Sequence, residues 1–407
     1  MLKFLQDSLA SVPASVGRLS HGRTMRAMTR TVLIACAWGC IVHSPAAAAT
    51  TEQVLWSFGN GTDGQQPYAG LLDVGGLGTL YGTTSGGGTY HNGTLFSLNL
   101  ATHAEAVLWS FGNGFDGQQP YANVISVNGK LYGATTAGGN DDVGTVFSFD
   151  PVGNVETVLH SFDVSNGQGP LYLTKVRDKL YGTTPWGGPG SGYNGTVYSV
   201  HLTTGATRVL YYFGNGTDSS HPYGALINVN GTLYGTAYAG GIYGYGTVFS
   251  FNPETHAEHL LWSFGNGTDG QSPSAGLINV KGTLYGTTYS GGTYGYGTVF
   301  SLNPTTDVET VLWSFGNGAD GQNPNKRLTN VNGTLYGTTV FGGTYSDGGT
   351  VFSLNPQTHV ETVLWSFGNG TDGLYPESDL LNVNGTLYGT TLYGGTYGGG
   401  AAFSIVP

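Results

Sequence analysis

The sequence predicts an all-β fold, a seven-bladed β-propeller with four antiparallel strands in each blade. The chain contains seven tandem copies of one repeat, because the tyrosine of a Leu-Tyr-Gly motif recurs at intervals of 49 to 53 residues. Each copy holds four short runs of alternating, β-branched or aromatic residues that end at Gly, Asn or Pro. No segment has helical periodicity, which excludes a helical solenoid. The seven tyrosines are Tyr81, Tyr132, Tyr181, Tyr234, Tyr285, Tyr336 and Tyr388.

The fifth copy illustrates one blade, with expected strands over residues 277–280, 283–287, 298–303 and 309–315. In other copies Asn-Gly, as in Asn332-Gly333, joins the first two strands as a two-residue turn, since both residues accept positive φ at low cost. Proline in Asn303-Pro304 places a turn before the fourth strand, because proline cannot donate a ladder hydrogen bond. A parallel β-helix is the structural alternative, but its coils are shorter and need no hairpin in each repeat.

The two ends of the repeat region predict how the ring closes. The region opens with a lone fourth strand over residues 52–58 and closes with a third strand over residues 401–406. Paired side by side, they complete a seventh blade and remove the exposed edges of an open array. Blade one then begins near Leu71, and blade seven combines residues 380–407 with residues 51–58.

Residues 1–49 are expected to be a signal peptide and residues 50–407 a single propeller domain. Five basic residues precede an apolar run at 31–42, which is too short to span a bilayer, and a stretch of small residues at 44–50. The translation start stays open between Met1, Met25 and Met28. We therefore expect a secreted, extracellular or periplasmic protein with no transmembrane helix in the mature chain.

The charge balance argues against nucleic acid as a partner. The leader holds five of the 13 basic and one of the 24 acidic residues, which leaves 8 basic and 23 acidic residues in the remainder. Charged residues are few, so the surface must consist largely of hydroxyl, amide and aromatic groups. Such a surface suits an extracellular protein, which we expect to be a monomer.

The repeat unit combines Asp-Gly and Pro, then Leu-Tyr-Gly-Thr-Thr, Gly-Gly and Gly-Thr-Val-Phe-Ser, from residue 54 to residue 404. It resembles the GloVer repeat family of exported bacterial proteins, the choice-of-anchor tandem repeat proteins. The resemblance implies an exported surface protein of undefined molecular function, often with a C-terminal sorting anchor. No such tail follows Ser404, so we expect secretion rather than anchoring.

An aspartate recurs in the linker between blades and has two interpretations. Asn and Asp spaced before Gly resemble part of a calcium-binding loop. Alternatively, each carboxylate accepts backbone N–H groups in an Asx-turn and shapes the linker, which we favour because a residue repeated in nearly every blade is expected to serve the blade. The aspartates are Asp63, Asp116, Asp218, Asp269, Asp320 and Asp372.

Aromatic residues in the loops between the second and third strands are candidate ligand-binding residues. These loops and the linkers are expected on the same rim, where propellers usually place their sites. Flat rings with polar tips suit a carbohydrate, although the same tyrosines can instead pack against the glycine-rich loops. The set is Tyr90, Trp186, Tyr193, Tyr243, Tyr245, Tyr294, Tyr296, Tyr345 and Tyr397.

Residues that break the repeat are the second set of candidates, since a single active centre cannot be sevenfold. Lys326 or Arg327 in the sixth linker could face Glu377 or Asp379 in the seventh across a blade boundary. For catalysis this would supply a carboxylate with a tuned partner, as glycosidases require. Alternatively, the residues form a structural ion pair that contributes little to the free energy of folding, which is the interpretation we favour. No catalytic residue is assigned.

The sequence favours a non-enzymatic binding or interaction protein that uses the loop-rich rim to hold a glycan or a surface protein. A carbohydrate-active enzyme, either a glycosidase or a lyase, is the first alternative, and a structural envelope component is the second. No cofactor is expected, with calcium at the linker aspartates as the alternative.

Overall fold

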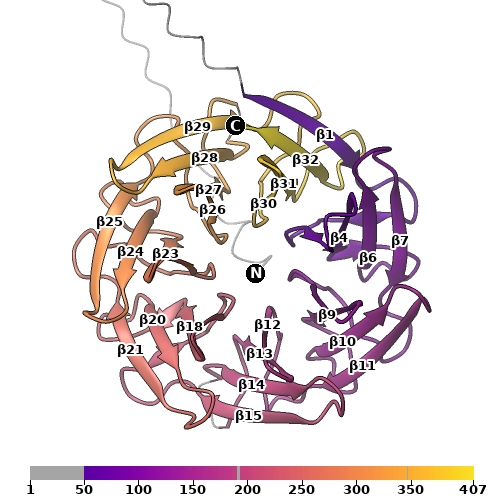
Figure 1. Ribbon diagram of the computed structural model, residues 1–407, viewed down its shortest axis with the longest axis horizontal. Helices are drawn as coiled ribbons and strands as arrows, with labels where there is room; N and C mark the ends of the chain where they lie inside the picture. Colours follow the sequence, from indigo (N-terminus) through magenta and orange to yellow (C-terminus); the bar gives the residue numbers. More distant parts are fainter. Residues whose placement is uncertain (1–49, 190–192, 346) are drawn as a thin grey trace, which may run out of the picture. The chain divides into compact units, whose positions relative to one another are not determined.

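The computed structural model describes residues 50–189, 193–345 and 347–407; the expected signal peptide lies outside them. Seven four-stranded antiparallel sheets are arranged as a ring around a central axis, and the described residues contain no helix (Figure 1). The chain is therefore a seven-bladed β-propeller, as predicted. No helix that could cross a membrane is found among the described residues.

Strand bounds for the first four blades are as follows. Blade one contains β3 (Leu72–Asp73), β4 (Thr79–Thr84), β6 (Thr94–Asn99) and β7 (Glu105–Ser110). Blade two contains β8 (Ile125–Val127), β9 (Lys130–Thr135), β10 (Thr145–Asp150) and β11 (Val155–Ser161). Blade three contains β12 (Leu173–Val176), β13 (Lys179–Thr184), β14 (Thr196–His201) and β15 (Thr207–Tyr212). Blade four contains β17 (Ile227–Val229), β18 (Thr232–Ala237), β20 (Thr247–Phe251) and β21 (Glu258–Ser263).

The remaining blades repeat this pattern. Blade five contains β22 (Ile278–Val280), β23 (Thr283–Thr288), β24 (Thr298–Asn303) and β25 (Val308–Ser314). The first and last residues of these strands agree with the predicted ones to within one residue. Blade six contains β26 (Thr329–Val331), β27 (Thr334–Thr339), β28 (Thr350–Asn355) and β29 (Val360–Ser366). Blade seven contains β30 (Leu381–Val383), β31 (Thr386–Thr391), β32 (Ala401–Val406) and β1 (Thr51–Ser57). Four short strands, β2 (Gly64–Gln65), β5 (Gly86–Gly87), β16 (Ser219–Ser220) and β19 (Ala239–Gly240), connect linkers to loops.

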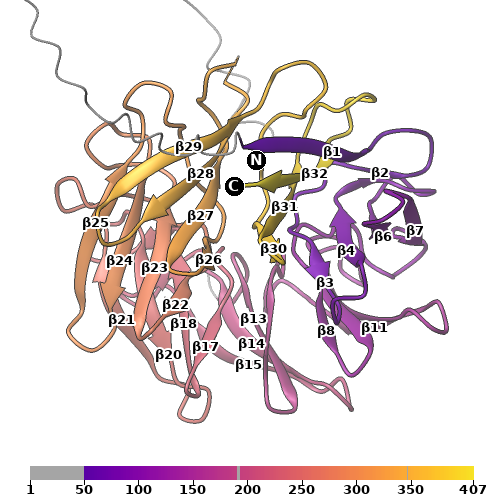
Figure 2. The same cartoon turned by 45° about the horizontal axis from the view of Figure 1, so that its top comes forward.

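Closure of the ring depends on pairing between the first and last strands. β1 runs antiparallel to β32 with Thr51 opposite Val406 and Ser57 opposite Ala401. The first strand of each blade lies nearest the axis, and the fourth runs around the circumference, as β1, β7 and β25 show (Figures 1 and 2). The end of one outer strand consequently approaches the start of the next, which forms a joint between blades.

Seven hydrophobic clusters hold the ring together, each between two neighbouring blades. Between blades four and five, the buried rings of Phe264 and Phe300 meet edge-on with centroids 5.0 Å apart. Burying one such ring stabilises the fold by about 1.5–3 kcal/mol. A Cβ on Gly286 would lie 2.6 Å from Phe300, so the glycine of Leu-Tyr-Gly leaves the space that this ring occupies.

A threonine after that glycine fixes five of the seven linkers where they reach the axis. The hydroxyl of Thr287 donates to the carbonyl of Lys326 in the next linker at 3.3 Å. Four other blades make the same contact, from Thr83 to Ala122, Thr236 to Ala275, Thr338 to Ser378 and Thr390 to Ala69. In these five linkers the bonds position the residues between the linker proline and the first strand of the next blade, where the candidate site lies.

Candidate ligand site at the propeller axis

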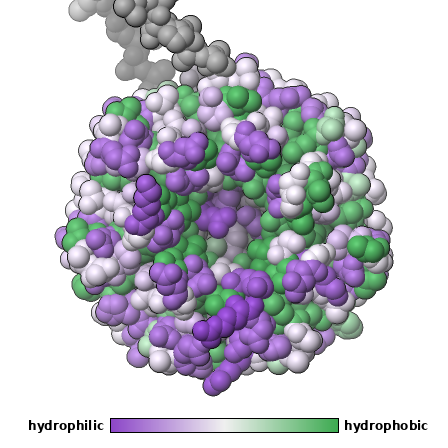
Figure 3. Space-filling view, in the orientation of Figure 1, coloured by the Kyte–Doolittle hydropathy of each residue, from purple (hydrophilic) through white to green (hydrophobic). Residues whose placement is uncertain are grey.

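The linkers and the loops between second and third strands share one rim, as the sequence predicted. In blade four, the N–H of Phe264 donates to the carbonyl of Gly246, and that of Ser272 donates to Tyr245, at 2.9 and 2.7 Å. Each linker thus starts against one of these loops and then runs inward to the axis. The surface of the ring is hollowed at the axis, bordered by hydrophilic and hydrophobic residues (Figure 3).

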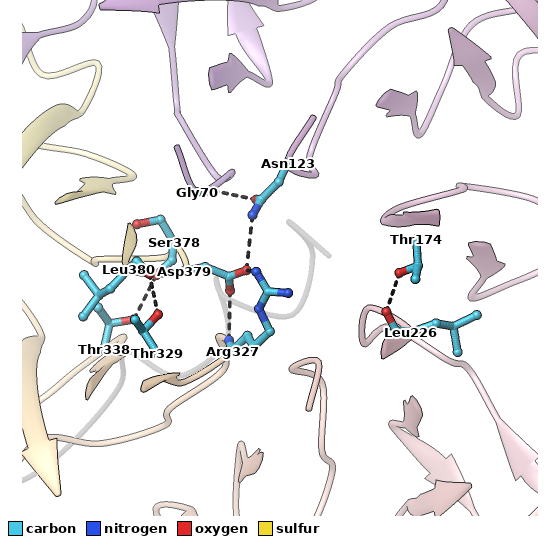
Figure 4. Close-up of polar contacts among 10 residues, drawn as sticks. All are labelled: Gly70, Asn123, Thr174, Leu226, Arg327, Thr329, Thr338, Ser378, Asp379 and Leu380. Atoms are coloured by element: carbon cyan, nitrogen blue, oxygen red, sulfur yellow. Dashed lines mark hydrogen bonds and ion pairs between the residues drawn. The ribbon is translucent and has the colours of Figure 1, made fainter. Parts of the chain in front are cut away.

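The structure brings the repeat-breaking charges of linkers six and seven together near the axis (Figure 4). The guanidinium of Arg327 lies 3.3 Å from Asp379 Oδ2, and the Arg327 backbone N–H donates to Oδ1 at 2.9 Å. The side chain of Asp379 is 9% exposed and that of Arg327 is 39% exposed. This ion pair crosses the boundary between blades six and seven, and because Asp379 is buried, removal of its partner would cost more than breaking a surface pair.

A third blade joins this pair through Asn123. Its side-chain amide donates to Asp379 Oδ2 at 3.2 Å and accepts the backbone N–H of Gly70 at 2.6 Å. A Cβ on Gly70 would lie 3.0 Å from the Asn123 amide nitrogen, so a side chain there would crowd the network. Three linkers are therefore tied to one carboxylate, and both its oxygens already accept hydrogen bonds.

Lys326 and Glu377 lie in the same two linkers. Burial raises the pKa of Glu377, although the charge of Lys326 and a 3.3 Å hydrogen bond from the Asn325 amide oppose the shift. Burial also disfavours the charged form of Lys326, but Tyr172, Glu377 and Asp379 outweigh it and raise its pKa. The Lys326 ammonium lies 5.8 Å from the ring centroid of Tyr68, within cation–π distance.

Aromatic rings form two arcs, which we call the axial arcs, and Tyr68 of the first arc contacts Lys326. They come from the residue just before or after the linker proline and from the two residues after the second strand. The first arc joins blades six, seven, one and two. Its ring centroids lie 5.3 Å apart for Phe341 and Tyr375, 6.1 Å apart for Tyr375 and Tyr393, and 4.7 Å apart for Tyr68 and Tyr121. The side-chain amide of Gln66 donates a hydrogen bond to the Tyr393 hydroxyl at 3.2 Å. In the second arc the ring centroids of Trp186 and Tyr223 lie 5.5 Å apart, and those of Tyr223 and Tyr238 lie 5.8 Å apart.

Of the nine loop aromatics that the sequence analysis selected, only Trp186 belongs to an axial arc. All nine are exposed, between 40% and 54%. Tyr245 and Tyr296 cover the linker glycines Gly265 and Gly316, where a Cβ would lie 2.4 Å from the tyrosine ring. The other seven residues of the axial arcs were not among the candidates from the sequence: Tyr68, Tyr121, Tyr223, Tyr238, Phe341, Tyr375 and Tyr393. The sequence feature that could have identified them is that the residues beside the linker proline and after the second strand differ from one repeat to the next.

The linker aspartates shape the chain at the joints. Asp269 Oδ1 accepts the N–H of Gly265 at 3.0 Å, and Oδ2 accepts the indole N–H of Trp262 at 3.3 Å. The glycine contact recurs at Asp63, Asp116, Asp218, Asp320 and Asp372. These bonds fit the Asx-turn interpretation. Within the described ranges, no three His, Cys, Asp or Glu side chains are grouped to hold a metal ion.

A family profile described as the Gloeobacter/Verrucomicrobia repeat matches residues 35–192 and 172–403. The chain belongs to this family. The match covers nearly all of the propeller, and it agrees with the resemblance drawn from the repeat unit. Comparison of this Gloeobacter/Verrucomicrobia repeat protein with curated proteins found no match.

Several solved structures share the propeller fold. The extracellular domain of BT4673 from B. thetaiotaomicron is similar with a TM-score of 0.57 and 16% identity, over 88% of this chain and 42% of that one. This chain therefore spans about two fifths of that domain. An oligogalacturonate lyase from Vibrio parahaemolyticus has a TM-score of 0.54 and 12% identity, over 87% of this chain and 93% of the lyase. At these identities the likeness shows the fold alone.

Proposed function

We propose that this repeat protein is an exported, non-enzymatic binding protein whose axial site binds a carbohydrate. The observation that carries the proposal is the network of Arg327, Asp379 and Asn123 near the axis, beside which Lys326 lies over the ring of Tyr68. Sugars present apolar C–H faces and a rim of hydroxyls; aromatic faces bind the former, and amide and charged groups bind the latter. The basic and apolar leader in residues 1–49 supports export.

The charge balance of the axial site favours an uncharged ligand. Arg327 and Asp379 neutralise each other, and Lys326 lies within the field of Glu377. The mature chain is acidic overall, which further disfavours an anionic ligand. A neutral oligosaccharide satisfies both hydrogen-bond donors and acceptors without adding charge.

A carbohydrate-active enzyme is the second candidate, because burial raises the pKa of Glu377 beside the Lys326 cation, an arrangement suited to acid–base chemistry. Glycoside hydrolysis ordinarily needs two carboxyl groups. The second carboxylate here, Asp379, accepts hydrogen bonds from Arg327 and Asn123 on both oxygens. This occupancy favours binding over turnover.

The test is thermal unfolding of residues 50–407 against neutral and acidic oligosaccharides, with Lys326→Met and Tyr121→Ala compared with the outer-loop variant Tyr294→Ala. We expect a neutral sugar to raise the midpoint of the wild type and of Tyr294→Ala but not of the two axial variants. A rise lost only in Tyr294→Ala would place the site on the outer loops. Sugar cleavage that Glu377→Gln abolishes would establish the enzyme, and no shift with any sugar would point to a protein partner.

A further inference from the structure

Six of the seven joints between blades contain a glutamate next to a linker aspartate. The glutamate begins the outer strand of one blade, and the aspartate belongs to the linker that enters that blade. The charge of the aspartate contributes to a raised pKa of the glutamate in each pair. The pairs are Glu52 with Asp372, Glu105 with Asp63, Glu156 with Asp116, Glu258 with Asp218, Glu309 with Asp269, and Glu361 with Asp320.

Five of these glutamates bury a carboxyl oxygen that has no hydrogen-bond partner. The atom is Oε1 of Glu52, Glu105, Glu156, Glu309 and Glu361. No cation among the described residues forms an ion pair with any of the six. A buried charge without a partner costs much more free energy than a buried neutral polar group, so this position favours the neutral acid over the ionised carboxylate.

In blade four the glutamate oxygen has a hydrogen-bond partner. There Ser219 replaces the linker glycine found at Gly64, and its hydroxyl lies 3.2 Å from Glu258 Oε1 and 2.7 Å from Thr247 Oγ1. A Cβ on Gly64 would lie 2.2 Å from Thr84, but blade four has Ala237 in place of that threonine. The exchange moves one hydroxyl from the strand to the linker and supplies a partner for the glutamate.

The joint between blades two and three lacks the arrangement as a whole. Thr207 stands where the glutamate would be, and His160 replaces the tryptophan that donates to the linker aspartate at four other joints. Asp163 there accepts hydrogen bonds from Ser165 and Asn166 of its own turn instead. The glutamate and its aspartate are thus missing together at this joint, whereas between blades three and four Tyr211 replaces the tryptophan while Glu258 and Asp218 remain.

We propose that the six joints form a proton-sensitive device in which each glutamate is held as a neutral acid, so that its ionisation loosens the contact between an outer strand and the preceding linker. The titratable groups that act on the glutamates are the paired aspartates, with Tyr211 also near Glu258. Burial, and secondly the aspartate charge, raises the pKa of Glu105 to about 7 and that of Glu309 to about 8.

The direction of the pH effect follows from these shifts. A carboxyl group with a raised pKa in the folded state binds a proton more tightly there than in the unfolded chain. Its contribution to stability is fully present below the ordinary value of 4.5 and is lost as the pH rises through about 7 to 8. Because six joints act together, the ring should weaken markedly between pH 5 and pH 9.

The test is thermal unfolding of residues 50–407 at pH values from 5 to 9, for the wild type and a variant with all six glutamates replaced by glutamine. We expect the wild-type midpoint to fall by about 10 °C over this range, and the variant to lose most of that fall. Glu254→Gln, which removes an exposed carboxylate, is the matched control and should keep the wild-type pH dependence. A wild-type midpoint that is constant or rises with pH would overturn the proposal.

A second measurement covers the case in which the sixfold variant does not fold. Carboxyl carbon NMR of glutamate-labelled wild-type protein should show a group of glutamates that titrate near pH 7 to 8. Titration of every glutamate below pH 6 would overturn the proposal. Single replacement of Glu309 by glutamine should remove one of the late-titrating signals.

Discussion

The side chains of Asn123 and Asp379 are hydrogen-bonded at 3.2 Å although blade one separates the blades that carry them. The contact is made near the axis, where the linkers of blades two and seven approach each other (Figure 4). Arg327 from blade six joins the same carboxylate. Asp379 thus connects linkers around almost half of the ring, and its loss should affect the fold as well as any bound ligand.

Replacing Asp379 with alanine should lower the free energy of unfolding by about 2–4 kcal/mol, because Arg327 and Asn123 would lose a partly buried anionic partner. Urea unfolding measures the change. The matched control is Glu254→Gln, which breaks the exposed Arg177–Glu254 pair and should cost less than about 1 kcal/mol. Equal losses in the two variants would contradict a structural role for the axial network.

Removing the first strand should prevent stable folding. A chain that begins at Gly59 lacks β1, so β32 loses its partner strand and Phe58, which is fully buried, leaves the core. A circular permutant that also starts at Gly59, with residues 50–58 joined after Pro407 through a short turn, restores the pairing and should fold. Circular dichroism and thermal unfolding compare the two chains. A stable fold in the truncated chain would contradict the closure.

Asp269→Ala should lower stability by about 1–3 kcal/mol, since Gly265 and Trp262 would lose their hydrogen-bond acceptor. Asp141→Ala, at an exposed aspartate outside the joints, is the control and should change stability by less than about 0.5 kcal/mol. A chelator should leave the wild-type midpoint unchanged. If calcium raises that midpoint and Asp269→Ala removes the rise, the aspartate is a metal ligand.

Gly286→Ala should destabilise the protein by about 1–3 kcal/mol, because the new Cβ would lie 2.6 Å from the buried ring of Phe300. The control is Gly153→Ala, where the nearest atom is 3.6 Å away and φ is not positive. Chemical unfolding of both variants checks the difference. A neutral Gly286→Ala would show that the core between blades accommodates the extra methyl group.

The sequence predicted the fold closely because each blade repeats its strand pattern, its turns and its glycine beside an aromatic ring, which is phenylalanine in six blades and Tyr198 in blade three. The expected strand at 298–303 coincides with β24, and the expected pairing of the two chain ends is the observed β1–β32 ladder. The same local sequence pattern occurs seven times, so that each copy supports the strand assignment of the others. Periodicity of this kind says little, however, about contacts at the axis.

The axial site was only partly predictable, because its geometry depends on how seven different linkers converge. The sequence predicted that Lys326 or Arg327 would face Glu377 or Asp379, and the Arg327–Asp379 pair matches that expectation. Asn123 was not selected, since its blade lies far along the chain from the others. The axial aromatics, such as Tyr121 and Tyr375, were likewise missed because the outer-loop tyrosines repeat more visibly.

The most direct test of the central claim is a crystal structure of residues 50–407 soaked with the neutral oligosaccharide that raises the unfolding midpoint most. The account predicts a sugar ring at the axis, stacked on Tyr68 or Tyr121 and hydrogen-bonded to Lys326 or Glu377. Sugar density confined to the outer-loop tyrosines, such as Tyr294, or an axial site without sugar, would contradict it.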